Sequence, residues 1–217
     1  MKQRILLIAL LLPTLLSAQD PKFRNGPKLG LTMSSQSSGG FLAWSGLPKF
    51  GPLIGWSFEM PVTSQLSLLL EPMYITKGYL YYTSTTKITN KGTFGYLELP
   101  MMVKISTNPD PQGLFITPGF MFGYWIYSHT YEAQDGTVRY DQTNDLYGAT
   151  NRTQWSIGFG IGEEKGNWLW EVRGQNSFQL FTPIVYAHNV VFSGSVAYRF
   201  PLEKKKKKPA DEDEDTP

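Results

Sequence analysis

Two histidines are the side chains of this chain best suited to acid–base chemistry near neutral pH. His129 and His188 each lie at the edge of a polar segment, and Asp135, Asp141 or Asp145 could orient either ring. Together with a serine, such a pair would form the dyad of an acyltransferase or a protease. Nothing in the spacing requires this arrangement, and loop histidines are more often solvated. We therefore predict that the protein is not an enzyme.

Three further patterns with chemical meaning are weak. The glycines of 158–162 resemble a phosphate-binding loop, but no helix follows them and they occupy alternate positions of a strand, which predicts small residues facing an interior. Residues 151–153 match a glycosylation sequon, which we discount. Residues 135–136 and 144–145 offer oxygen ligands to calcium without the spacing of a defined site. We predict no metal and no cofactor.

The composition limits the partners of the chain. Its 217 residues include no cysteine, which excludes disulfides, thiolate metal sites and a lipid-modified cysteine. The 20 basic and 18 acidic residues become equal in number once Lys2 and Arg4 are removed with an export signal. A chain without net charge has no electrostatic footprint for nucleic acid, so we expect no nucleic-acid partner.

The first residues have the layout of a secretory signal peptide. Two cations precede an apolar run over 5–16, and small residues follow at 17 and 18. That run is too short to span a bilayer as a helix. We predict a signal peptide over 1–18, an N-terminal periplasmic segment over 19–27, and no membrane helix in the mature chain.

Apolar residues then recur with a period of two, which is typical of strands. Eight such segments are expected, at 28–34, 51–60, 67–76, 96–105, 114–124, 155–162, 168–175 and 190–200. They are joined alternately by short turns and long polar loops; the turns are 61–65, 106–112 and 163–167, and the loops are 35–50, 77–93, 128–152 and 177–188. An even number of strands with this alternation predicts an all-β fold, an eight-stranded antiparallel up-and-down transmembrane β-barrel over 28–200.

A soluble periplasmic barrel of the lipocalin kind, with its apolar face inward around an apolar ligand, is the main alternative fold. Three features favour the membrane. The second face is rich in Gly, Ser and Thr with few charges, aromatic residues gather near strand ends, and the last strand ends on Tyr198 and Phe200, the aromatic-terminated pattern that signals barrel closure. We therefore predict that the protein lies in the cell outer membrane with both termini in the periplasm. Its expected partners are outer-membrane lipids and, during insertion, the barrel assembly machinery.

The few charges of the second face would lie in the lumen and must be paired, since an isolated charge in a low dielectric is costly. They are Glu59, Glu71, Glu98, Lys104, Glu171, Arg173 and Arg199. We favour a structural network that fills the barrel over a solute-selecting pore, because eight strands leave no aqueous channel.

Four segments resemble the strands of the PorT-like outer-membrane β-barrel family. They are EPMYITKG at 71–78, YLELP at 96–100, FMFGY at 120–124, and NVVFSGSVAYRF at 189–200. The resemblance implies an outer-membrane barrel, and through the family's name-giving member it suggests an accessory role in a protein secretion and gliding machinery of the type IX kind. The charged tail after Phe200 departs from the family pattern.

Residues 201–217 form that tail, with five lysines followed by an acidic run. It lacks the apolar residues needed to fold, so we predict a disordered periplasmic segment. Lys204, Lys205, Lys206, Lys207 and Lys208 would lie beside lipid headgroups, and the acidic run could dock a periplasmic protein. The function we predict is that of a small non-enzymatic outer-membrane barrel with a filled lumen, with a structural or accessory role through its extracellular loops or periplasmic tail.

Overall fold

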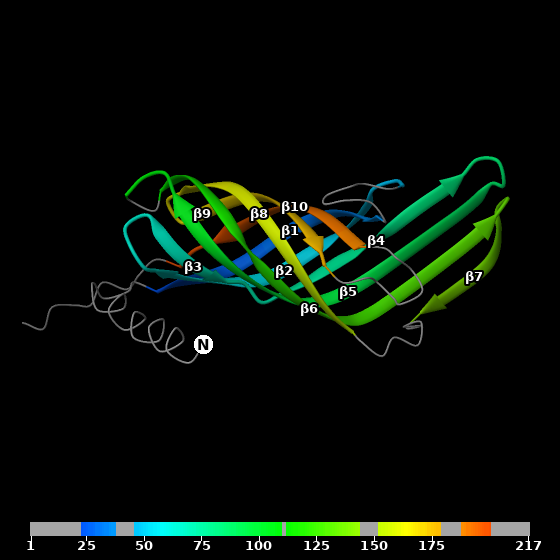
Figure 1. The fold of residues 1–217 in the computed structure, drawn as a ribbon, viewed down its shortest axis with the longest axis horizontal. Coiled ribbons are helices and arrows are strands. Elements are labelled where there is room, and N and C mark those ends of the chain that lie inside the picture. Colours follow the sequence, from blue (N-terminus) through cyan, green and yellow to red (C-terminus); the bar gives the residue numbers. More distant parts are fainter. Residues whose placement is uncertain (1–22, 38–45, 110–111, 144–151, 179–187, 201–217) are drawn as a thin grey trace, which may run out of the picture.

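The fold is an antiparallel β-barrel with a sheet that extends beyond one end (Figure 1). The computed structural model describes residues 23–37, 46–109, 112–143, 152–178 and 188–200. Within these ranges the strands are β1 (Arg24–Ser37), β2 (Lys49–Pro61), β3 (Leu66–Leu70), β4 (Met73–Thr83), β5 (Ile88–Ser106), β6 (Gly113–Gln134), β7 (Thr137–Thr143), β8 (Thr153–Lys165), β9 (Trp168–Ser177) and β10 (His188–Tyr198).

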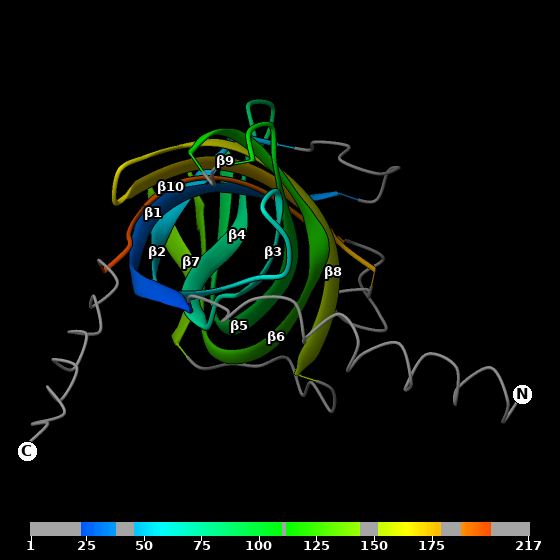
Figure 2. The same ribbon diagram turned by 90° about the vertical axis from the view of Figure 1, so that its left-hand side faces the viewer.

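The first and last strands close the ring. β1 pairs with β2 on one side and with β10 on the other, with Lys28 opposite Ala197. The ring continues from β2 through β3 and β4 to β5, then through β6, β8 and β9 back to β10. The end view in Figure 2 shows this closed wall. Closure leaves no unpaired edge in the wall, as a membrane-spanning sheet requires.

The third expected strand is interrupted. β3 ends at Leu70 and β4 begins at Met73, yet both keep the same register against β2 and β5. Together they form one interrupted strand of the wall; each strand position around the ring is called a stave here. Pro72 has no N–H to give to the ladder, and its carbonyl accepts instead from the Trp56 N–H at 2.9 Å. Since β7 lies outside the ring, the described strands form an eight-stave barrel.

The two faces of the wall have opposite character. Outward side chains are large and apolar; those more than half exposed on the wall include Leu31, Ile54, Leu97, Phe120, Ile161 and Val172. Inward side chains combine small apolar clusters with many polar and charged groups, and Glu59, Lys104 and Arg199 are fully buried. A soluble ligand-binding barrel has the reverse arrangement, so the lipocalin-like alternative is wrong for this wall. None of the described residues belongs to a helix long and apolar enough to cross a membrane.

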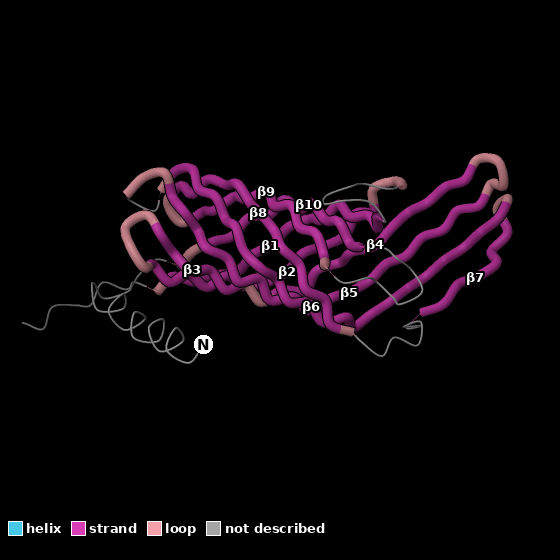
Figure 3. Tube along the Cα trace, viewed as in Figure 1, coloured by secondary structure: helices cyan, strands magenta, loops and turns pink. Residues whose placement is uncertain are grey.

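Two of the expected loops are strands. The segment 77–93 is the hairpin of β4 and β5, and most of 128–152 is the hairpin of β6 and β7, so the loop predictions were wrong there. These two hairpins, over 79–93 and 128–143, form a sheet that extends past the other strands (Figure 3). This extension is called the blade here. Asp135 and Gly136, both with positive φ, form the two-residue turn between β6 and β7. An Asp-Gly pair between strand-forming residues is a hairpin signal that the sequence carried.

The end of the barrel opposite the blade is called the turn end. The short turns after β2, β5 and β8 lie there, as does Arg24, the first residue of β1. β1 therefore begins inside the expected periplasmic segment 19–27. Its first residue, Arg24, lies opposite Glu59 of β2, and its guanidinium group contacts the Glu164 carboxylate in the lumen. The predicted signal peptide and the charged tail lie outside the described residues.

The outward face supplies the first prediction. Phe120, 58% exposed on β6, should tolerate arginine poorly, because a cation near the bilayer midplane destabilises a barrel by about 2–4 kcal/mol. Urea unfolding of Phe120→Arg in lipid vesicles measures this loss. Val138→Arg on the blade is the control and should change the free energy of unfolding by less than about 0.5 kcal/mol. Equal losses in both variants would contradict a lipid-facing wall.

Candidate functional site

The lumen is organised around β9, whose alternate residues Glu171, Arg173 and Gln175 point inward at successive levels. At the middle level, Arg173 and Lys28 each bond both Glu71 and Glu171. Lys28 Nζ lies 2.9 Å from Glu71 Oε1 and 2.7 Å from Glu171 Oε2. Arg173 Nη2 lies 2.7 Å from Glu71 Oε2 and 2.8 Å from Glu171 Oε2. These four residues, the central cluster, carry two charges of each sign and are all nearly fully buried.

Hydroxyls complete the central cluster. Ser57 donates to Glu71 Oε1 at 2.8 Å, and Thr117 donates to Glu171 Oε1. Gly160 faces the same carboxylate, and a Cβ built there would come within 2.4 Å of Glu171 Oε1. Gly160 therefore makes room for Glu171 of β9, while Gly158 and Gly162 make room for Met121 and Phe115 of β6, as small interior residues do in a narrow barrel.

Nearer the turn end is a second group, the turn-end cluster of Arg24, Glu59, Lys104, Glu164 and Arg199. Lys104 Nζ bonds Glu59 Oε1 at 3.0 Å and also bonds Glu164, which Arg24 contacts from the other side. Arg199 Nη1 donates to the Ser57 carbonyl at 3.0 Å, while its Nε lies 3.5 Å from Glu59 Oε2. Three cations face two carboxylates, and Arg199 Nη2 has no hydrogen-bond partner among the described residues.

Nearer the blade is a third group, the blade-end cluster of Lys77, Glu98, Gln154 and Gln175. Lys77 Nζ lies 3.2 Å from Glu98 Oε1 and 3.1 Å from Gln154 Oε1. Gln175 Nε2 donates to the same Glu98 oxygen at 3.0 Å. This cluster is one ion pair braced by two amides, without net charge.

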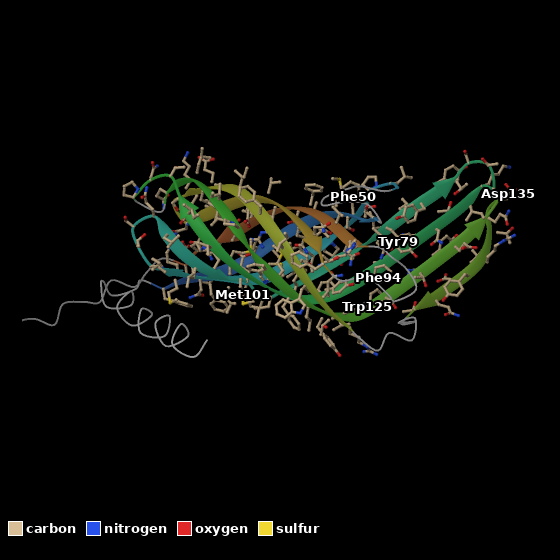
Figure 4. All side chains as sticks on the ribbon, viewed as in Figure 1. Phe50, Tyr79, Phe94, Met101, Trp125 and Asp135 are labelled. Atoms are coloured by element: carbon tan, nitrogen blue, oxygen red, sulfur yellow. The ribbon has the colours of Figure 1, made fainter. Side chains whose placement is uncertain are left out.

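An aromatic layer lies over the blade-end cluster. The Tyr96 ring faces Lys77 Nζ at 4.8 Å and stacks on Trp125, and Phe94 meets Trp125 edge-on at 5.4 Å. Tyr79 extends the layer to the base of the blade, where Figure 4 shows it beside Phe94 and Trp125. Phe94, Tyr96 and Trp125 are each at most 2% exposed, so the lumen is closed to solvent at this level.

On the blade itself, Tyr81 continues the row of rings, 5.3 Å from Tyr79. Partial burial raises the pKa of the Tyr81 phenol above its usual value. The hydroxyl therefore stays protonated at neutral pH and donates to the Gln36 carbonyl at 2.8 Å. This bond ties the end of β1 to the inner face of the blade.

The structure brings all seven sequence-predicted lumen charges into the interior, where none is more than 4% exposed. It also adds partners that the sequence analysis missed: Arg24, Lys28, Lys77 and Glu164. Lys28 and Lys77 lie at inward positions of strands, so alternation could have found them. Arg24 and Glu164 lie at strand ends, where alternation gives no face.

The predicted closing residues lie on the outer surface of the seam. Tyr198 packs edge-on against Trp168 at 5.0 Å, and Phe200 lies 5.9 Å from Trp56. The Phe200 N–H donates to the Asn25 carbonyl at 2.9 Å, which fastens the chain end to β1. The tail lysines 204–208 fall outside the described residues.

The two histidines were the candidates for acid–base chemistry, and one of them contacts an aspartate. His129 Nε2 lies 2.8 Å from Asp141 Oδ1 on the blade, where Asp141 is exposed and His129 is half-buried. Among the described residues, His188 Nδ1 is buried without a hydrogen-bond partner. Within the same ranges, no three His, Asp or Glu side chains gather as a metal site. Asp145 lies outside these ranges.

A closed eight-stave ring with lipophilic exterior and paired charges inside defines a membrane barrel. The sequence model of the family described as "Outer membrane protein beta-barrel domain" matches residues 17–182, more than half of the chain. The chain belongs to this family, which places it in the class of outer-membrane barrels. No curated protein sequence matches the chain significantly.

Several solved structures match the chain at low sequence identity. Ail, the attachment invasion locus protein of Yersinia pestis, is 11% identical over 84% of this chain and 100% of its own, with a TM-score of 0.49. Neisserial surface protein A is 10% identical over 82% and 97%, with a TM-score of 0.45. The N-terminal barrel domain of Pseudomonas aeruginosa OprF is 12% identical over 84% and 100%, with a TM-score of 0.36. These values add nothing to the family assignment.

The blade-end cluster supplies the second prediction. Glu98→Leu leaves Lys77 buried without its carboxylate and should lower the free energy of unfolding by about 3–5 kcal/mol. The double variant Lys77→Met/Glu98→Leu removes both charges and should lose less than the single variant does. Urea unfolding of the four proteins of this double-mutant cycle measures the coupling.

An exposed pair is the matched control. Lys87 and Asp135 are 3.0 Å apart at the blade tip and mostly exposed, so Lys87→Met should cost no more than about 1 kcal/mol. A Glu98→Leu loss as small as this one would show that water reaches the blade-end cluster, contrary to a filled lumen.

Proposed function

We propose that the protein is a non-enzymatic, non-conducting outer-membrane anchor that presents the blade as a contact surface outside the cell. The observation that carries this proposal is the contrast between the two parts of the molecule. The lumen is filled by three buried charge clusters and an aromatic layer, while the blade extends strands past the wall with most of β7 exposed. Because no solute would pass through this lumen, we place the function in the segments that extend beyond the membrane.

The proposal fixes an orientation, with the turn end in the periplasm and the blade outside. Short turns on the periplasmic side and longer connections outside are usual for bacterial barrels. Both chain ends would then be periplasmic, since β1 begins and β10 ends at the turn end.

Cysteine labelling tests this orientation, because the natural chain has no cysteine. Ser84→Cys lies at the exposed tip of the β4–β5 hairpin, and Ser64→Cys lies in the exposed turn after β2. A membrane-impermeant maleimide should label Ser84→Cys on intact cells and Ser64→Cys only after the outer membrane is permeabilised. The reverse pattern would overturn the proposed display.

Conductance tests the closed lumen. Purified protein in planar bilayers should give no current steps under conditions in which a general diffusion porin does, because eight staves enclose side chains and no channel. Reproducible steps from the parent protein, weakened by changes at Lys77 or Glu98, would favour the solute-selecting pore.

The tail is proposed as a separate element with a docking role. The closing strand is complete by Phe200, whose N–H already bonds Asn25. Ending the chain there should therefore leave a barrel that migrates faster in unboiled than in boiled gel samples. Loss of a periplasmic protein that co-purifies with the full chain, and its loss at high salt, would support docking through Lys204–Lys208 and the acidic run. Failed insertion would instead place an assembly signal in the tail.

The PorT-like resemblance stays a prediction within the broader family. If the protein takes part in a secretion machinery, its tail or turn end would contact the other subunits. Co-purification of those subunits with the full chain is the test. Of the two roles, the structure of the blade supports display outside the cell.

A further inference from the structure

One edge of the blade is the outer edge of β7; the other, on β4, is partly covered by a bridge from Leu47 to Leu80. β7 hydrogen-bonds to β6, and no other strand of the described ranges pairs with it. Six of its seven residues are exposed. An open edge of this length can add another extended strand, and proteins ordinarily protect such edges. The residues along this edge indicate which strand fits.

The sequence of β7, Thr-Val-Arg-Tyr-Asp-Gln-Thr, is self-complementary about its central residue. When two β7 strands pair antiparallel with Tyr140 opposite Tyr140, Arg139 of each copy lies opposite Asp141 of the other. The same register sets Thr137 opposite Thr143. Opposite charges and threonine pairs that face each other directly across antiparallel strands stabilise the pairing.

The charges also exclude neighbouring registers. A pairing centred on Arg139 would set two guanidinium groups opposite each other, and one centred on Asp141 would set two carboxylates opposite each other. Like charges in directly opposed positions are destabilising. A one-residue slip between these registers turns the side chains to the other face of the sheet. The register centred on Tyr140 is therefore the favoured one.

Both charges are available for this contact. Arg139 is exposed and makes no ion pair within the described ranges. Asp141 is exposed and uses one oxygen, Oδ1, in its contact with His129 at 2.8 Å. A carboxylate has acceptor sites on both oxygens, so Asp141 can bond His129 and a second cation together.

The geometry sets the direction of the second molecule. The two-fold axis of such an antiparallel strand pair is perpendicular to the sheet. The blade continues the barrel wall, as Figures 1 and 3 show, so this axis is perpendicular to the barrel axis. A rotation of 180° about it turns the partner barrel to point the opposite way. The two barrels would then lie in facing membranes.

We propose that β7 pairs with β7 of a second copy on a facing membrane, so that the protein joins outer membranes to each other through a continuous intermolecular sheet. The inference rests on the proposed function, because it needs the blade outside the cell. The contact is isologous, with the same patch used on both molecules, and so it closes on two copies.

Charge reversal tests the pairing. Full-length protein is displayed on a Gram-negative host with short lipopolysaccharide, and clumping is measured between cells of two colours. Arg139→Asp sets carboxylates opposite each other and Asp141→Arg sets cations opposite each other, so each should lower clumping at least tenfold. Arg152→Asp makes the same charge change as Arg139→Asp at an exposed position before β8, away from this edge, and should clump like the parent.

Two combinations restore complementarity. Cells with Arg139→Asp mixed with cells with Asp141→Arg should clump with strict alternation of colour, and the double variant Arg139→Asp/Asp141→Arg should clump with itself. In detergent, sedimentation should show a dimer of the parent, monomers of each single variant, and a dimer of their equimolar mixture.

The outcomes separate this inference from the proposed function. A parent that neither clumps nor dimerises, or single variants that lose association without recovering it when mixed, would overturn β7 pairing. Ser84→Cys labelling on the same cells reports display independently. Normal labelling without association would reject only the β7 pairing. Absent labelling together with a charge-dependent dimer in detergent would reject the display of the blade outside the cell.

Discussion

Charge pairing inside a closed ring is the constraint on which the rest of this structure depends. Eight staves leave an interior just wide enough for side chains. Long charged residues fill it, and each would be costly there without a counter-charge. The central cluster meets this demand with two cations shared between two carboxylates. Such sharing ties β1, β9 and the break between β3 and β4 together across the lumen, so the network fixes their relative positions as well as the charge balance.

The same constraint determines what lies around the clusters. Gly160 leaves space for Glu171, and the break at Pro72 lies next to Glu71, which is buried among the cations. The outward face of the wall is largely apolar, while the charged side chains of the three clusters are buried on the inward face. A ring with this distribution is stable in lipid, where every backbone group must be paired within the protein.

The blade follows a different rule, since it lies beyond the clusters. Its inner face begins as an aromatic layer over the lumen and its strands are held by backbone pairing and by short-range contacts such as Lys87–Asp135. The wall has no open edge, but the blade has one. The balance of Arg139 and Asp141 about Tyr140 makes that edge selective, because the charges favour one register of one partner strand over its neighbours.

The sequence by itself determined the class of fold, the strand alternation and the inward position of seven charged residues. It could do so because a period of two assigns a face to every residue in the middle of a strand. It did not locate the limits of strands, where alternation fades. Hence 77–93 and 128–152 were expected as loops, and Arg24 and Glu164 were not expected in the lumen. Only the tertiary structure decided which charges share partners, because Lys28, Glu71 and Glu171 come from strands far apart in sequence. It alone also left β7 at an edge, because β6 pairs with β8 in the wall and with β7 only beyond it.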